Sequence, residues 1–161
     1  MIRKLGMTVA MLALMMAPAL ANPGHAGHHD EDKNAVYGHP GDPAKADRTV
    51  TITATEVAYD VKDITVKSGE IVKFVLINQG QQDHEFTIGD DKTLVEHREM
   101  MTKMTPEQME KMGHHHTNAV TTKPGETKTL VWQFGKPGAY EFACNYPGHS
   151  ELGMQGTLTV Q

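Results

Sequence analysis

The residues of this chain best suited to chemistry lie near its C-terminal end, in the segment 144–154 (CNYPGHSELGM). Cys144, His149 and Met154 follow one another with four residues between each pair. A thiolate, an imidazole and a thioether are soft ligands, which suit copper better than magnesium, calcium or a closed structural zinc site. An electron-transfer copper centre uses two histidines, one cysteine and a weak axial methionine. The segment therefore offers three of four such ligands, and a second histidine has to come from elsewhere.

His84 is the candidate for that second histidine, because it lies at the end of a strand-like run in the segment 78–86 (NQGQQDHEF). A strand that ends at Cys144 would direct the thiol inward, and the loop 145–148 would return His149 to the same end of a β-sandwich. A further turn would bring back Met154 as the last strand begins. We therefore expect one copper ion bound by His84, Cys144, His149 and Met154.

Three other interpretations of Cys144 are less favoured. Structural zinc sites rarely use methionine and usually contain paired cysteines. A Cys–His nucleophile would need an oxyanion-binding element, and no Gly-rich segment of that kind lies nearby. An inert buried cysteine is the third alternative, but a single thiol in an exported chain cannot form an internal disulfide, and metal binding would give it a role.

The N-terminal residues have the pattern of a secretory signal peptide. Arg3 and Lys4 precede an apolar run over 7–16 and an Ala-x-Ala site at 19–21, as in exported proteins. The run is too short to span a bilayer as a stable helix. Cleavage after Ala21 would leave 140 residues and change the formal charge from −5 to −7. We expect a periplasmic single-domain protein, with no membrane insertion of the mature chain and no nucleic-acid partner.

Residues 22–47 are rich in histidine, acids, glycine and proline and contain few large apolar side chains. Such a segment cannot bury enough surface to fold alone, so we predict a flexible tail. His25, His28 and His29 are solvated residues by default and candidate copper or zinc ligands by hypothesis. His39 and His97 have no assigned role.

From residue 48 onward the sequence alternates polar and branched or aromatic residues between Gly/Pro turns, which is typical of β-strands. About seven short strands predict an all-β protein with a Greek-key sandwich or barrel. The expected strands are 49–55, 61–66, 71–78, 85–88, 127–134, 139–144 and 156–160. Together they define one domain over 48–161.

An insertion over about 90–123 interrupts this rhythm. Thr105 and Gln108 form a capping-box pattern around Pro106, and Gly113 is a stop signal, so we expect a short helix over 106–112, with one more turn before it as a variant. Thioethers favour Cu(I), but methionine is also an adaptable packing residue, and both interpretations stay open. The candidate accessory copper ligands in the insertion are Met100, Met101, Met104, Met109, Met112, His114, His115 and His116.

Residues from about 48 to 161 resemble a cupredoxin, through the Cys-x₄-His-x₄-Met segment and an Asn-x-Gly-x-x-x-His segment that ends at His84. The His-rich N-terminal segment and the Met/His-rich insertion are most similar to the CopI-type periplasmic copper-resistance cupredoxins. The resemblance implies type 1 copper ligation by His84, Cys144, His149 and Met154. Many cupredoxins place Asn or Ser directly after the first histidine ligand, whereas this chain has Glu85, which leaves the reduction potential and the colour open.

Three functions are consistent with these features. The first is copper tolerance, with copper ions and a periplasmic redox or copper-handling protein as partners. The second is electron transfer between redox partners through the edge of His149. The third is oxidation of Cu(I), which would need an external electron acceptor because one type 1 site cannot reduce O₂. The Met/His-rich insertion favours the first, since an electron carrier does not need it.

Overall fold

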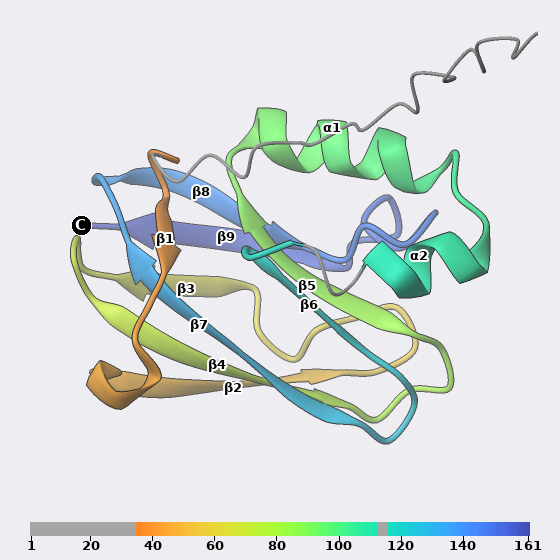
Figure 1. Ribbon diagram of the computed structural model, residues 1–161, viewed down its shortest axis with the longest axis horizontal. Coiled ribbons are helices and arrows are strands. Elements are labelled where there is room, and N and C mark those ends of the chain that lie inside the picture. Colours follow the sequence, from red (N-terminus) through yellow and green to blue (C-terminus); the bar gives the residue numbers. More distant parts are fainter. Residues whose placement is uncertain (1–34, 113–115) are drawn as a thin grey trace, which may run out of the picture.

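The computed structural model describes residues 35–112 and 116–161, so the signal peptide, His25, His28, His29, His114 and His115 lie outside the described residues. Two β-sheets pack face to face, and the longest helix, α1 (Asp91–Met101), lies above them in Figure 1. This two-sheet architecture confirms the predicted all-β sandwich.

One sheet has four strands in the order β1-β7-β4-β2 and the other has five in the order β3-β9-β8-β5-β6. The pairs β2–β4 and β3–β9 are parallel and the remaining pairs are antiparallel. The strands are β1 (Gly38–Pro40), β2 (Arg48–Ala54), β3 (Asp63–Val66), β4 (Ile71–Asn78), β5 (His84–Gly89), β6 (Ala119–Thr122), β7 (Thr127–Phe134), β8 (Gly138–Ala143) and β9 (Gln155–Val160). The helices are η1 (Pro43–Lys45), α1 (Asp91–Met101) and α2 (Pro106–Met112).

The core lies between the two sheets and is rich in aromatic rings. Along β4 every second side chain is buried, as expected for a strand with one face on the core. Phe74 of β4 lies 5.2 Å from the ring of Phe86 on β5, which lies 5.3 Å from the ring of Phe142 on β8. The strands that lead to His84 and Cys144 are therefore anchored in the core.

The tail expected over 22–47 is wrong for its last thirteen residues, 35–47, which fold onto the sandwich. Strand β1 pairs with β7, and Tyr37 is 7% exposed. The ring of Tyr37 stacks on Trp132 with centroids 5.7 Å apart. A three-residue strand has too few positions to show periodicity. The sequence therefore did not indicate that the aromatic residue of this polar segment packs on the sandwich.

The insertion also differs from its expected bounds. Helix α2 confirms the helix predicted over 106–112, and Thr105 and Gln108 form the reciprocal capping bonds. Helix α1 is longer than the single turn considered before it, and Asp90 caps it by accepting a hydrogen bond from the backbone N–H of Thr93 at 2.8 Å. Strand β6 pairs with β5, so residues 119–122 belong to the sheet rather than to the insertion.

Helices α1 and α2 are too short and too polar to cross a bilayer, and within the described ranges no other helix meets that requirement.

Candidate metal centre

Three of the four predicted ligands meet at one end of the sandwich. His84 is the first residue of β5, Cys144 directly follows β8, and His149 lies in the loop between β8 and β9. Because β5 and β8 are antiparallel neighbours, with Thr87 paired to Ala143, their ends bring His84 beside Cys144. One donor atom from each of the three side chains lies within 4.8 Å of the other two.

The loop that carries the later ligands closes on itself through backbone hydrogen bonds. Cys144 N–H donates to the carbonyl of Met154 at 2.9 Å, and Met154 N–H donates to the carbonyl of His149 at 2.9 Å. Gly148 has φ of 86°, in the left-handed region that favours glycine, and allows the chain to turn back. Met154 is fully buried at the base of this loop. The fourth predicted ligand therefore lies in the segment that holds Cys144 and His149.

The environment of His84 fits a metal cation. The side chain is fully buried, and neither ring nitrogen has a partner at good hydrogen-bond geometry within the described part of the chain, although the Thr55 backbone lies close enough to favour the protonated ring and tends to raise its pKa. Buried polar atoms without partners are costly, and those found in native proteins often serve a site of function. The ring of His149 lies 5.2 Å from that of His84, and its Nδ1 is 3.3 Å from Cys144 Sγ. A metal ion that accepts imidazole and thiolate donors would satisfy all three groups.

The protonation states in the metal-free protein follow from burial. Burial, with the nearby His149, lowers the pKa of His84, and burial lowers the pKa of His149. Both imidazoles are therefore neutral near pH 7, the form that binds metals. Burial raises the pKa of Cys144 to about 12. A metal ion consequently has to displace the thiol proton when it binds.

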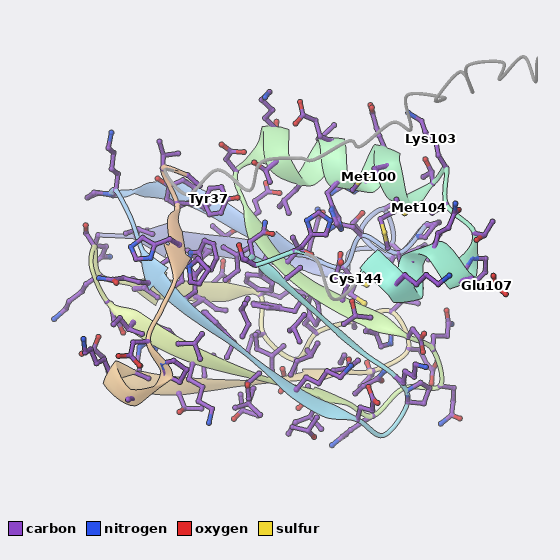
Figure 2. All side chains as sticks on the ribbon, viewed as in Figure 1. Tyr37, Met100, Lys103, Met104, Glu107 and Cys144 are labelled. Carbon is purple, nitrogen blue, oxygen red and sulfur yellow. The ribbon has the colours of Figure 1, made fainter. Side chains whose placement is uncertain are left out.

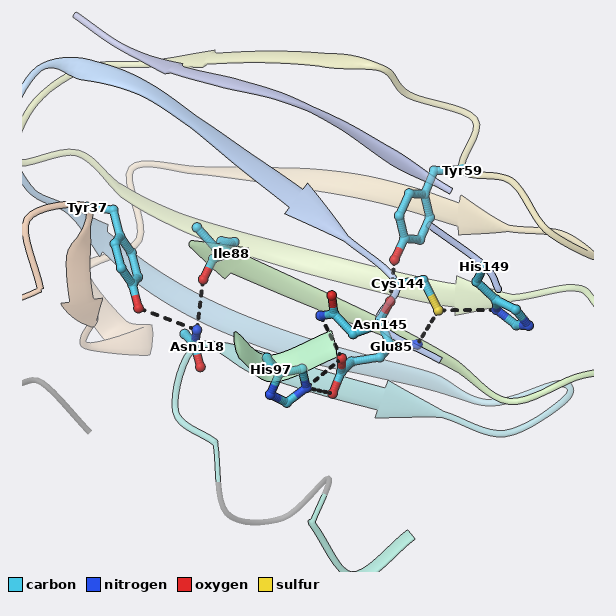
Figure 3. A network of polar contacts seen from close by, with 9 residues as sticks. All are labelled: Tyr37, Tyr59, Glu85, Ile88, His97, Asn118, Cys144, Asn145 and His149. Atoms are coloured by element: carbon cyan, nitrogen blue, oxygen red, sulfur yellow. Dashed lines mark hydrogen bonds and ion pairs between the residues drawn. The ribbon is translucent and has the colours of Figure 1, made fainter. Parts of the chain in front are cut away.

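The backbone of β5 orients the sulfur atom. Glu85 N–H donates to Cys144 Sγ at 3.4 Å, and the hydroxyl of Tyr59 donates to the carbonyl of Glu85 (Figure 3). On the outer side, the second ring nitrogen of His149 contacts Gln82 Oε1 at 3.2 Å. The sulfur and one imidazole are thus held in place by groups that are not themselves predicted ligands.

The sequence reasoning assigned no role to His97, yet His97 lies next to this centre. Its Nε2 donates to both carboxylate oxygens of Glu85, at 3.1 and 3.0 Å, and Asn145 Nδ2 donates to the same carboxylate at 3.1 Å. Burial tends to raise the pKa of Glu85, but the contact with His97, followed by those with Thr87 and Asn145, outweighs it and holds that pKa below its ordinary value. The sequence did hold one indication that His97 is buried. Leu94, His97 and Met101 are spaced three and four residues apart, as on the inward face of a helix.

The accessory ligands predicted in the insertion lie partly within the described residues, which include Met100, Met101, Met104 and His116. Met101 is buried and Met104 half-buried, and Figure 2 shows Met100 and Met104 on the insertion. The ring of His116 packs edge-on against His97, with centroids 4.7 Å apart. Within residues 35–112 and 116–161, no second group of three His, Cys, Asp or Glu side chains has donor atoms as close as those of His84, Cys144 and His149.

Comparison with known proteins gives the family. The model of the cupredoxin-like domain family matches residues 8–160. The copper-resistant cuproprotein CopI of Rubrivivax gelatinosus is 39% identical over 95% of this chain and 94% of its own length. CopI of Pseudomonas aeruginosa is 33% identical over 95% of this chain and 93% of its own length. CopI of Vibrio cholerae is 41% identical over 76% of this chain and 71% of its own length.

Solved structures with a similar fold include proteins called auracyanins. A reduced auracyanin from Roseiflexus castenholzii is 28% identical, with a TM-score of 0.58, over 72% of this chain and 98% of that one. Auracyanin B shares the fold, with a TM-score of 0.61 at 20% identity over 79% of this chain and 96% of that one. The chain belongs to the cupredoxin family and is similar over most of its length to the copper-resistant cuproproteins called CopI.

Proposed function

We propose that this protein is a periplasmic copper-binding cupredoxin that confers copper tolerance through one type 1 copper site. The observation that carries the proposal is the convergence of His84, Cys144 and His149, with both ring nitrogens of His84 buried and, among the described residues, without a partner at good hydrogen-bond geometry. We infer that these three side chains bind the ion and that Met154 is a weak axial ligand. Bound copper would supply one-electron chemistry between Cu(I) and Cu(II).

The chain itself supplies a dry and rigid surrounding for that ion. His84, Cys144 and Met154 are fully buried and His149 is 7% exposed. Two ligands lie at the ends of adjacent strands whose other residues pack in the aromatic core, so the donor atoms have little freedom to follow a change in oxidation state. A site of this kind would hold copper in both states with small rearrangement.

Tolerance is proposed over plain electron transfer for two reasons. The CopI relatives are named as copper-resistant cuproproteins and match this chain over most of its length. The Met/His-rich insertion would add low-affinity Cu(I) ligands that an electron carrier does not need. Export by the predicted signal peptide over residues 1–21 would place the protein in the periplasm.

Growth in copper tests this proposal. A strain that lacks the gene is expected to stop growing at a lower copper concentration than its parent, and the restored gene should bring back growth. The gene with Cys144→Ala should fail to do so at equal protein level, measured by immunoblot of the periplasmic fraction. Equal growth of the deletion and parent strains across the copper series would contradict the tolerance role.

The accessory sites are tested separately by changing methionines to leucine in the insertion. Leucine has a similar volume, so each change should cost less than about 1.5 kcal/mol of stability. The variant with Met100, Met101, Met104, Met109 and Met112 replaced is expected to bind fewer Cu(I) ions per chain, measured by competition with a chromophoric chelator. Its Cu(II) spectrum should be unchanged.

The matched control is Met154→Leu, which should alter the Cu(II) spectrum and keep the additional Cu(I) ions. An unchanged Cu(I) stoichiometry in the five-methionine variant would mean that those side chains only pack the insertion.

Electron transfer is the second candidate, favoured by one surface feature. Leu152 is 73% exposed and lies in the same loop as His149. An exposed apolar side chain in the loop that carries His149 would be available to contact a redox partner. If the deletion strain grows normally in copper, this candidate becomes the stronger one.

A further inference from the structure

Among the described residues, a buried polar contact joins the insertion to β5, the strand that begins with His84. Helix α1 packs over β5 and β8, and its inward-facing His97 is 7% exposed. His97 Nε2 donates to the Glu85 carboxylate, which is 2% exposed. The contact spans twelve residues of sequence and links the helix to the strand that begins with His84.

Glu85 in turn forms two hydrogen bonds at the start of the ligand loop. Its carboxylate accepts a hydrogen bond from Asn145 Nδ2 at 3.1 Å, and its backbone N–H donates to Cys144 Sγ at 3.4 Å (Figure 3). Asn145 Oδ1 is buried and makes no hydrogen bond within the described residues. The bond to Glu85 therefore has a large part in fixing the Asn145 side chain, and with it the first residue of the ligand loop.

We propose that His97 is a positioning residue for the metal centre, which acts through Glu85 and Asn145 to fix the place of the Cys144 sulfur. The expected effect of His97 on bound copper rests on the proposed copper site. The expected effect of His97 on the position of the Cys144 thiol applies to the metal-free protein as well. It gives the insertion a role at the centre that does not depend on any accessory copper site.

The physical reason is the cost of a buried carboxylate. Glu85 can remain in its place only while donors satisfy its oxygens. Without His97, both oxygens lose a donor at 3.1 and 3.0 Å, and the carboxylate has to turn toward other donors or toward water. Either movement weakens the bond to Asn145 and frees the start of the loop.

Alkylation of the metal-free protein provides the test, because Cys144 is the single cysteine of the chain. The rate of reaction with iodoacetamide at pH 9 reports how often the loop opens and exposes the thiol. His97→Leu is expected to raise that rate about tenfold, the factor that corresponds to about 1.4 kcal/mol, since hydrogen bonds to charged groups are worth at least that much. His97→Gln, whose amide can donate to Glu85, should restore a rate within about threefold of the wild type, which corresponds to less than 1 kcal/mol.

Leu94→Ala is the matched control. Leu94 is a fully buried residue of α1 for which the structure shows no bond to Glu85 or Asn145. This variant should lower the thermal midpoint through loss of packing and leave the alkylation rate at the wild-type level under conditions where both proteins are folded. If Leu94→Ala raises the rate as much as His97→Leu does, His97 only holds the helix down and the proposal is overturned.

The Cu(II)-loaded variants give a second readout. His97→Leu should change the relative intensities of the thiolate-to-copper absorption bands, and His97→Gln and Leu94→Ala should not. An unchanged alkylation rate and spectrum in His97→Leu would overturn the proposal. Should His97→Leu not fold, His97→Asn takes its place under the same criteria, because its shorter side chain cannot reach Glu85.

The two proposals fail in different ways. Absence of any thiolate-to-copper band in the wild-type protein would refute the copper site. The alkylation rates of the metal-free proteins would still decide whether His97 positions Cys144.

Discussion

Replacing Cys144 with alanine is expected to abolish the strong visible absorption of the Cu(II)-loaded protein. That absorption requires charge transfer from a thiolate to copper, and Cys144 carries the single thiol of the chain. The remaining imidazoles of His84 and His149 can still bind Cu(II), but without the thiolate the site gives only weak bands. The measurement is an absorption spectrum of the wild type and the variant at equal copper loading.

Proton release provides a second readout of the same substitution. The pKa of the metal-free Cys144 thiol is raised to about 12 by burial, so the thiol is protonated at pH 7 and copper has to displace its proton. Loading the wild type in weak buffer should therefore release about one proton per copper at pH 7 to 8. Protons compete with the metal, so apparent affinity should rise with pH, about tenfold per unit below the thiol pKa.

The variant should release no proton from this position, and its affinity should depend on pH only where the histidines titrate. Met154→Leu serves as the control, because it keeps the thiolate and should keep a strong band, shifted in position. A strong band that survives in Cys144→Ala would refute the thiolate assignment.

Replacing Tyr37 with alanine is expected to lower the free energy of unfolding by about 3 kcal/mol, near the lower end of the range for buried aromatic residues. The ring stacks on Trp132 at 5.7 Å and meets Tyr140 edge-on at 6.1 Å. Its hydroxyl also accepts a hydrogen bond from Asn118 Nδ2 at 3.5 Å. For a domain of this size, the thermal midpoint should fall by about 10 °C.

Val36→Ala is the matched control, because Val36 is 45% exposed and should change stability by less than about 0.5 kcal/mol. Tyr37 lies well away from Cys144 and His149 along the sandwich (Figure 3), so the copper spectrum of Tyr37→Ala should match the wild type. An unchanged midpoint, measured by circular dichroism or calorimetry, would show that residues 35–47 are not part of the folded domain.

The sequence was a good guide to the longer strands and a poor one to two of the short strands, β1 and β6. Strand β7 was predicted at its observed bounds and β4 likewise, because eight residues are enough for the alternation of buried and exposed positions to be visible. Strands β1 and β6 have three and four residues. At that length a run of buried residues cannot be distinguished from a loop, and pairing with β7 or β5 decides its conformation.

The candidate ligand set could be identified without coordinates. Cys144, His149 and Met154 lie within one short loop, and His84 lies at a recognisable strand end, so residue types and spacing were sufficient to single them out. The groups that surround these ligands became visible in the folded chain. His97 and Asn145 meet at Glu85 from three separate segments, and Tyr37 meets Trp132 across 95 residues. Contacts of this kind depend on how the sheets and the insertion pack, which local periodicity does not encode.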